Sequence, residues 1–281
     1  MLRVRPFQHT ARLLEWQRLL VALGMVPATG NGRTFDAGSG RISLQPAHPA
    51  LPGLAGRAEL GFEVRVLAEF ARRTNLDAQG DGRIPAVMSG DGASCGISAP
   101  DGFSFLAATA NPAVPTVGAD PALAVVGLWF TEDPSAAART LGWIGARPRT
   151  GHAAADASAF TAKNGGVILV RPGHGPARSG LGFEYDGDLA ALCGRLQAAG
   201  FAAALAGQGP DGPGSLLRVP HPDAGQDPGK GTVPGAGGNA APGTDATAGQ
   251  GAGESTAGGA VDGTATPAPG ELWITRRPPM G

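Results

Sequence analysis

The feature that most constrains this chain is a tetrapeptide that occurs twice, far apart. Leu-Gly-Phe-Glu stands at residues 60–63 and again at 181–184, so the copies are 121 residues apart (181 − 60). A glycine that closes a predicted helix recurs at the same distance, as Gly24 and Gly145. A Pro-Asp turn recurs at 100–101 and 222–223. This shared spacing predicts a tandem duplication of a unit of about 115 to 120 residues, a period too long for a solenoid repeat.

A Gly/Ala-rich segment interrupts the second unit. Residues 226–269 contain no aromatic residue and no Leu, Ile or Met. Such a composition cannot bury enough apolar surface to offset its ordering entropy, so we predict a disordered insertion. The apolar residues 272–274 that follow predict a last strand returning to the sheet. The predicted organisation is a first unit at 1–115 and a second unit at 116–281, which contains the insertion at 226–269.

Both units show the same predicted order of elements. A first strand is followed by an amphipathic helix, a hairpin, the Leu-Gly-Phe-Glu strand, a second helix and two further strands around the Pro-Asp turn. The predicted ranges in the first unit are 2–8 for the first strand, 35–44 for the hairpin and 67–73 for the second helix. Their counterparts are 123–130, 160–169 and 188–199. The first helix of the first unit carries an apolar stripe of Leu13, Trp16 or Gln17, Leu20 and Leu23. Irregular alternation of strands and helices indicates an α+β protein.

Composition argues against several classes of partner. Lys plus Arg number 22 against 23 for Asp plus Glu, without a long run of either sign, so no nucleic acid partner is expected. No stretch approaches the roughly 18 apolar residues of a membrane span, so no membrane partner is expected either. Charges near the N-terminus do not indicate export, which makes the cytoplasm the expected location. The two cysteines, Cys95 and Cys193, are expected to be buried thiols.

Four segments carry a resemblance to a known family. They are LGFEVRVLAEFARR, APDGFSFL, LGFEYDGDLAALCGRLQAAG, and HPDAG followed after the insertion by GELWI. In this order they resemble the vicinal oxygen chelate superfamily, which includes glyoxalases, bleomycin-resistance proteins and extradiol dioxygenases. The resemblance implies two tandem βαβββ units whose curved mixed sheets form a cup, with helices outside and a ligand or metal within.

The resemblance also implies where metal ligands would stand: on the first strand, at the start of the Leu-Gly-Phe-Glu strand, and on the strand after the Pro-Asp turn. In the first unit these positions carry Arg3 or Arg5, Glu59 and Leu106. In the second unit they carry Val125 or Val126, Gly180 and a residue within 272–274. Only Glu59 is a competent ligand, whereas a catalytic divalent ion needs about three donors. We therefore expect no metal, with Glu59 as the ligand if one binds.

The histidines do not change that expectation. None of the five shows a His-x-His or His-Glu-x-x-His spacing, and most lie in or beside predicted turns, so we interpret them as exposed or structural. They are His9, His48, His152, His174 and His221.

Strand alternation assigns side chains to the cup. Leu60 and Phe62 must face the helices, so Glu59 and Glu63 face the other way. The predicted ligand-binding residues are Glu59, Glu63, Glu184, Arg5, Trp129 and Trp273. The three glutamates would either converge as carboxylates with raised pKa values or pair with arginines across the sheet, and we favour the pairing. The two tryptophans would either stack on a flat ligand or pack in the core, and core packing is favoured. No catalytic residue can be named.

Three hypotheses for function follow. The first is a glyoxalase- or bleomycin-resistance-like protein, monomer or homodimer, that binds a small organic molecule in the cup between the two units without a metal. The second is a metal-dependent lyase, isomerase or dioxygenase of the same superfamily. The third is an interaction scaffold in which the segment 226–269 recruits a partner, and deletion of that segment would separate it from the first.

Overall fold

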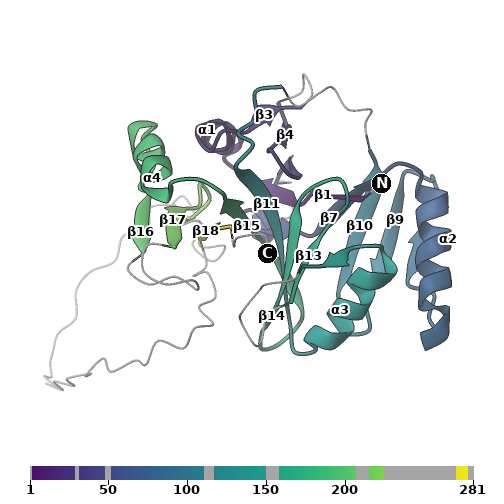
Figure 1. The fold of residues 1–281 in the computed structure, drawn as a ribbon. Helices are drawn as coiled ribbons and strands as arrows, with labels where there is room; N and C mark the ends of the chain where they lie inside the picture. Colours follow the sequence, from purple (N-terminus) through teal and green to yellow (C-terminus); the bar gives the residue numbers. More distant parts are fainter. Residues whose placement is uncertain are drawn as a thin grey trace, which may run out of the picture.

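The computed structural model describes residues 2–28, 32–47, 52–110, 117–149, 158–206, 215–224 and 270–277. The predicted boundary between the units and the segment 226–269 lie outside these ranges. Four helices lie on curved mixed sheets, as expected of an α+β protein (Figure 1). Among the described residues, no helix is long and apolar enough to cross a membrane.

The second half of the chain forms one eight-stranded sheet in the order β12-β13-β14-β11-β15-β18-β17-β16. The strands are β11 (Leu123–Thr131), β12 (Arg147–Pro148), β13 (Ser158–Thr161), β14 (Val167–Pro172), β15 (Arg178–Tyr185), β16 (Ala204–Ala206), β17 (Leu216–Pro220) and β18 (Glu271–Arg276). Strands β11 and β15 pair antiparallel at its centre. Strand β18 pairs with β15 and β17, which confirms that the chain returns to the sheet after residue 269.

The first half repeats this order, but its sheet is divided in two. One part is β3-β4-β5-β2-β6 and the other is β1-β7-β10-β9-β8. The strands are β1 (Leu2–Val4), β2 (Phe7–Thr10), β3 (Val26–Pro27), β4 (Thr34–Asp36), β5 (Arg41–Pro46), β6 (Ala58–Glu59), β7 (Gly61–Val64), β8 (Ala86–Met88), β9 (Ser94–Ser98) and β10 (Ser104–Thr109). The sequence predicts one continuous strand at the start of each half. That strand is continuous only in the second half, as β11, and is divided into β1 and β2 in the first half.

The division lies where Pro6 interrupts the first strand, because proline has no N–H to donate to a neighbouring strand. Arg5 N still donates to Gly61 O at 2.8 Å, so the two parts remain adjacent. A side chain at position 61 would place its Cβ 2.4 Å from the ring of Phe7 and 2.6 Å from Arg5 O. Gly61 of the Leu-Gly-Phe-Glu strand is therefore required for this close approach.

Each half contains the order βαβββ twice, with one helix in each copy. The helices are α1 (Leu13–Ala22), α2 (Leu67–Ala78), α3 (Pro134–Trp143) and α4 (Leu189–Ala198). The chain thus carries four βαβββ modules where the sequence led us to count two. The reason is that the Leu-Gly-Phe-Glu strand does not end a module; it begins the second module of each half.

Local signals in the sequence explain where the helices begin and end. Asp133 Oδ1 accepts a hydrogen bond from Ala136 N at 2.9 Å and so caps the start of α3. Gly24, Gly145 and Gly200 follow α1, α3 and α4 with φ between 85° and 95°. This left-handed conformation is readily available to glycine, which confirms the predicted role of Gly24 and Gly145 at the helix ends, and Gly200 has the same role.

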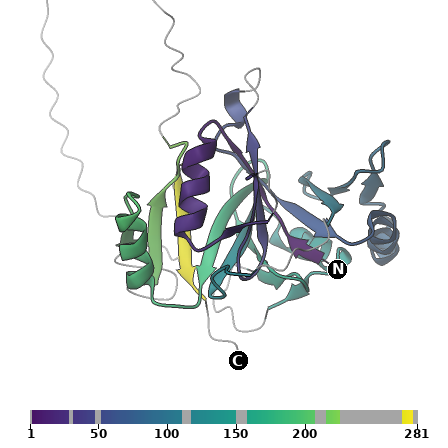
Figure 2. The ribbon, with the colours of Figure 1, turned by 90° about the horizontal axis from the view of Figure 1, so that it is seen from above.

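The two halves share their hydrophobic core. Helices α1 and α4 lie together on one side of the molecule, and α2 and α3 lie together on the other (Figures 1 and 2). One apolar cluster contains Leu20 of α1 with Leu192 of α4, and the other contains Ala71 of α2 with Leu141 of α3. Because each cluster takes side chains from both halves, neither half buries its helix-facing surface alone. Cys95 and Cys193 are both free and buried, as expected.

The Pro-Asp turn of the second half is anchored in the first half. Asp223 Oδ1 accepts hydrogen bonds from Thr10 Oγ1 and from Ala11 N, both at 3.0 Å. Its other oxygen accepts one from Trp16 Nε1 at 2.8 Å. The carboxylate is buried, so these three donors replace its hydration.

The Pro-Asp turn of the first half makes the reciprocal contact with the second half. Asp101 Oδ2 accepts hydrogen bonds from Thr131 Oγ1 at 2.7 Å and from Trp129 Nε1 at 3.1 Å. Thr131 ends the first strand of its half, as Thr10 does in the other. The repeated turn is therefore a device that joins the two halves.

Candidate functional site

A cavity of about 1250 Å³ lies where the two halves meet. Strand β15 of the second half passes strand β6 of the first, and Ser179 Oγ donates to Ala58 O at 2.7 Å. Both halves supply the walls. The lining residues are Gln8, Leu54, Gly56, Arg57, Ala58, Glu59, Leu60, Gly96, Ile97, Ser98, Phe103, Ser104, Phe105, Leu106, Leu128, Phe130, His174, Pro176, Ala177, Arg178, Ser179, Gly180, Leu181, His221, Gly270, Glu271 and Leu272.

Apolar side chains dominate this lining. Phe103 and Phe105 come from the first half, and Leu128 and Phe130 from the second. Leu106 also lines the cavity and is 44% exposed. Ten of the 27 lining residues are polar or charged, so apolar surfaces and polar groups occur together, as they do in sites for small organic ligands.

Glu59 is the one predicted ligand-binding residue that lines the cavity. Its Oε2 lies 3.3 Å from His9 Nε2, close enough for an ion pair but not aligned as a hydrogen bond. The glutamate side chain is half exposed, whereas that of His9 is 15% exposed. Glu59 therefore presents a carboxylate to the cavity with a histidine behind it.

His221 forms part of the wall and is buried. Its Nδ1 accepts a hydrogen bond from Asp223 N at 3.1 Å, so in this arrangement that nitrogen carries no proton. Asp223 Oδ2 lies 3.8 Å away and would pair with the ring only if Nδ1 were protonated. Burial lowers the pKa of His221, and the charge of Asp223 and a contact with Gly56 only partly oppose it. The neutral ring also packs edge-on against Trp16, with ring centroids 4.9 Å apart.

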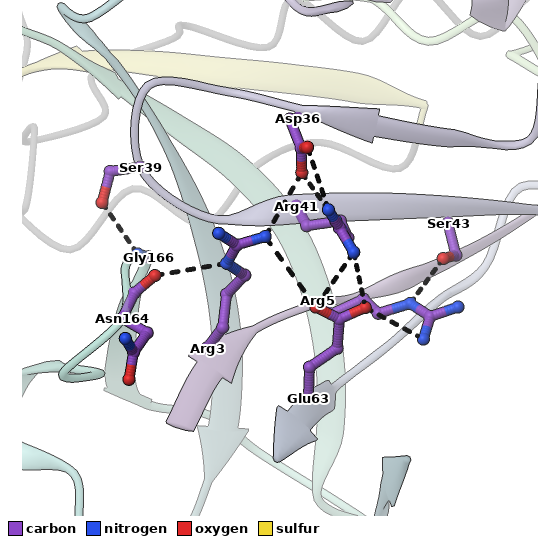
Figure 3. Close-up of polar contacts among 9 residues, drawn as sticks. All are labelled: Arg3, Arg5, Asp36, Ser39, Arg41, Ser43, Glu63, Asn164 and Gly166. Carbon is purple, nitrogen blue, oxygen red and sulfur yellow. Dashed lines mark hydrogen bonds and ion pairs between the residues drawn. The ribbon is translucent and has the colours of Figure 1, made fainter. Parts of the chain in front are cut away.

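Glu63 belongs to a separate, buried cluster of charges (Figure 3). Arg41 NH1 donates to both of its oxygens, at 3.0 and 3.2 Å, and the same guanidinium donates to Asp36 at 2.6 and 2.9 Å. Arg5 NH1 lies 3.2 Å from Glu63, and Arg3 NH1 lies 3.5 Å from Asp36. Three guanidiniums thus share two carboxylates on the face of the sheet opposite the helices.

The surroundings shift the pKa values of Arg41 and Arg5 in opposite directions. Burial opposes the charge of Arg41, but its hydrogen bonds and charge interactions with Asp36 and Glu63 outweigh that effect and raise its pKa. Burial lowers the pKa of Arg5, and the charge of Glu63 only partly offsets it. Arg5 Nε also donates to Ser43 Oγ at 2.7 Å. Arg5 is therefore committed to structural contacts and does not line the cavity.

Glu184 occupies the equivalent place in the second half. Arg149 NH1 donates to both of its oxygens, at 2.7 and 2.9 Å, and Arg277 Nε lies 4.0 Å away. The three predicted glutamates consequently do not converge, and Glu63 and Glu184 pair with arginines. The alternative of a shared carboxylate site is wrong for the described geometry.

The two predicted tryptophans do not line the cavity. Trp129 lies opposite Ser179 and so on the same face as Leu181, which is the helix side of the sheet. It is fully buried against Phe103, at 4.7 Å between ring centroids. The favoured alternative, core packing, therefore holds for Trp129, and the alternative of a cup-lining Trp129 misassigned the phase of its strand. Trp273 does face away from the helices, but it is buried beneath the guanidinium of Arg218.

The positions that would hold a metal do not fit one. In the first half, Arg5 is bound to Ser43 and Glu63, Glu59 is paired with His9, and Leu106 has no donor atom. In the second half, Val126 and Gly180 offer no side-chain donor. Among the described residues, no three His, Cys, Asp or Glu side chains gather as a metal site requires. We therefore derive no chemistry through a metal.

Comparison with solved structures identifies the fold. An extradiol ring-cleaving dioxygenase from Brevibacterium fuscum matches 99% of this chain and 71% of its own, at 13% identity and a TM-score of 0.54. A variant of homoprotocatechuate 2,3-dioxygenase from the same organism matches 79% of this chain and 68% of its own, at 14% identity and a TM-score of 0.50. The chain has the vicinal oxygen chelate fold. No family model and no curated protein sequence matches it.

The paired motifs therefore predicted the vicinal oxygen chelate fold correctly. They did not predict most of the residues that line the cavity. Arg57, His174 and Arg178 lie in or beside turns, where no periodicity indicates what a side chain faces. The only usable signal was the position of His221 directly before the repeated Pro-Asp turn. It was interpreted as structural, and its buried hydrogen bond with Asp223 agrees with that interpretation.

Proposed function

We propose that this protein binds a small organic molecule in the cavity between its two halves and does so without a metal. The observation that carries the proposal is the cavity itself, which has a volume of about 1250 Å³ and walls that combine apolar side chains with polar and charged groups. Sites for small ligands have this character and often lie where two structural units meet.

The fold is compatible with this function but does not decide it, because one fold hosts many activities. The dioxygenases with the same fold are named for ring cleavage, and at 13–14% identity the likeness supports the fold alone. The donor set at the superfamily's metal positions supports binding over metal-dependent chemistry. We favour a binding function like that of glyoxalase- or bleomycin-resistance-like proteins.

Blocking the cavity from an exposed position tests this proposal. Ser104 is exposed on β10 and lines the cavity, so Ser104→Trp fills the space without disturbing the core. Ser135 is exposed on α3 and is not among the lining residues, which makes Ser135→Trp the matched control.

A library of small aromatic and aliphatic compounds is screened against the full chain by ligand-observed NMR, and hits are titrated by calorimetry. Hits should bind Ser104→Trp about tenfold or more weakly and bind Ser135→Trp like the parent. If no compound binds, or if hits bind both variants equally, the cavity is not the site.

A further inference from the structure

The charged side chains that line the cavity differ in whether they form ion pairs. Four lining side chains are charged: Arg57, Glu59, Arg178 and Glu271. Both carboxylates have cationic or ionisable partners outside the lining, since Glu59 lies 3.3 Å from His9 and Glu271 lies 4.0 Å from Arg218. Among the residues the structure describes, neither Arg57 nor Arg178 forms an ion pair. The cavity therefore offers two guanidiniums whose charge no neighbouring carboxylate satisfies.

Arg178 is held in a defined orientation. Its guanidinium lies over the ring of Phe130, 4.7 Å from the centroid, and its NH1 lies 3.4 Å from His174 O. A guanidinium that stacks with one face on an aromatic ring leaves its edge N–H groups directed outward. These groups are suited to receive the two oxygens of a carboxylate in parallel hydrogen bonds.

Arg57 lines the cavity from the first half. The hydrogen bond from Ser179 Oγ to Ala58 O, at 2.7 Å, joins the residues that directly follow each arginine. Arg57 O also accepts a hydrogen bond from His9 N at 2.9 Å, which fixes its backbone. The backbones that carry the two lining arginines are thereby held next to each other, although Arg57 and Arg178 are 121 residues apart in sequence (178 − 57).

We infer that Arg178 and Arg57 form a carboxylate subsite, and that the ligand is a flat, apolar carboxylate. This inference rests on the proposed function and adds the ligand class to it. The carboxylate would pair with Arg178 at the rim, and the apolar body would lie against Phe130, Leu128 and Phe105. Two arginines and no lysine line this space, which favours a planar anion that accepts a forked donor.

The probe pair is 2-naphthoate and its neutral amide, 2-naphthamide, titrated into the full chain by calorimetry. They share one apolar body and differ in charge. The variants are Arg178→Gln, Arg178→Lys and Arg57→Gln, with Arg139→Gln on the exposed side of α3 as the matched control.

The acid should bind the parent about tenfold or more tightly than the amide. Arg178→Gln should remove most of this preference while leaving the affinity for the amide unchanged. Arg178→Lys should restore part of it, since it keeps the charge but loses the fork, and Arg57→Gln should have a smaller effect than Arg178→Gln. Arg139→Gln should behave like the parent.

Two results overturn the inference, and they are distinguishable. If both probes bind equally and the arginine variants do not discriminate between them, the cavity binds ligands but holds no carboxylate subsite. If neither probe binds and the library screen with Ser104→Trp also fails, the proposed function fails together with the subsite.

Discussion

Glu63 and Glu184 occupy equivalent positions in the two halves, and both are 1% exposed, yet their surroundings differ. Glu63 pairs with Arg41, whose side chain is 4% exposed, in a cluster that also holds Asp36 and Arg5. Glu184 pairs with Arg149, whose side chain is 12% exposed. The first half thus fills its inner sheet face with buried charge.

Apart from Glu184 and Arg149, the second half carries a cluster of apolar side chains on the same face. Val126, Leu128 and Phe130 form a small cluster there with Val167 and Leu169. Two helix-facing residues of the Leu-Gly-Phe-Glu strand, in contrast, are identical in both halves, namely Leu60 with Leu181 and Phe62 with Phe183. This difference indicates that packing against helices restricts which residue types a sheet can carry on its helix-facing side. The inner face is less restricted and can carry either charged or apolar side chains.

Replacing each glutamate by alanine should give the largest difference in stability between the two halves. Glu63→Ala leaves Arg41 buried with one carboxylate partner lost, and should reduce the free energy of unfolding by about 3–5 kcal/mol. Glu184→Ala should cost less, about 1–3 kcal/mol, because water can reach Arg149 more readily. Urea denaturation of both variants measures the two losses. Equal losses would show that the two inner faces are energetically alike.

The reciprocal Pro-Asp turns allow a second comparison between the halves. Asp223 accepts three hydrogen bonds from the first half, whereas Asp101 accepts two from the second. Asp223→Asn should therefore destabilise the chain by about 2–3 kcal/mol and Asp101→Asn by about 1–2 kcal/mol. Thermal unfolding followed by circular dichroism gives the order of the two, and the reverse order would contradict the assigned roles.

The smallest expected effect is a pH dependence that only the second half carries. The residue before the Pro-Asp turn is His221 there and Ala99 in the first half. Because burial lowers the folded-state pKa of His221, both states are neutral above its ordinary value of about 6.5. Below that pH the unfolded chain gains a proton that the folded chain does not, so stability falls with acidification toward the folded pKa.

His221→Ala, which copies the first half, is the variant that isolates this effect. Its stability should fall less than that of the parent between pH 7.5 and 5.5, because the groups common to both proteins cancel in the comparison. Denaturation midpoints at several pH values measure the difference. Parallel curves would mean that His221 titrates alike in both states.

Much of the fold was accessible from the sequence because its determinants are local or repeated. Helix-closing Gly24 and Gly145, the capping Asp133 and the returning strand at 271–276 each have a direct signature. The division of the first sheet at Pro6 was not predicted, although a proline within a strand is a reason to expect it.

The site was less accessible, because it depends on which face each strand presents and on contacts between distant turns. Glu59 was predicted and does line the cavity, whereas Trp129 was placed on the wrong face. Arg178 and Arg57 were missed since their proximity arises only when β15 passes β6. A single sequence does not show which residues of the two halves lie next to each other, so such pairs can be identified only from the structure.

The central claim is that the cavity binds an organic molecule without a metal, and one titration tests it most directly. The affinity for 2-naphthamide, or for the best neutral hit of the screen, is measured after chelator treatment and again with added Zn²⁺, Mn²⁺ or Fe²⁺. We predict the same dissociation constant in every case and no stoichiometric metal in the protein. Binding that disappears with the chelator and returns with one of these ions would contradict the account.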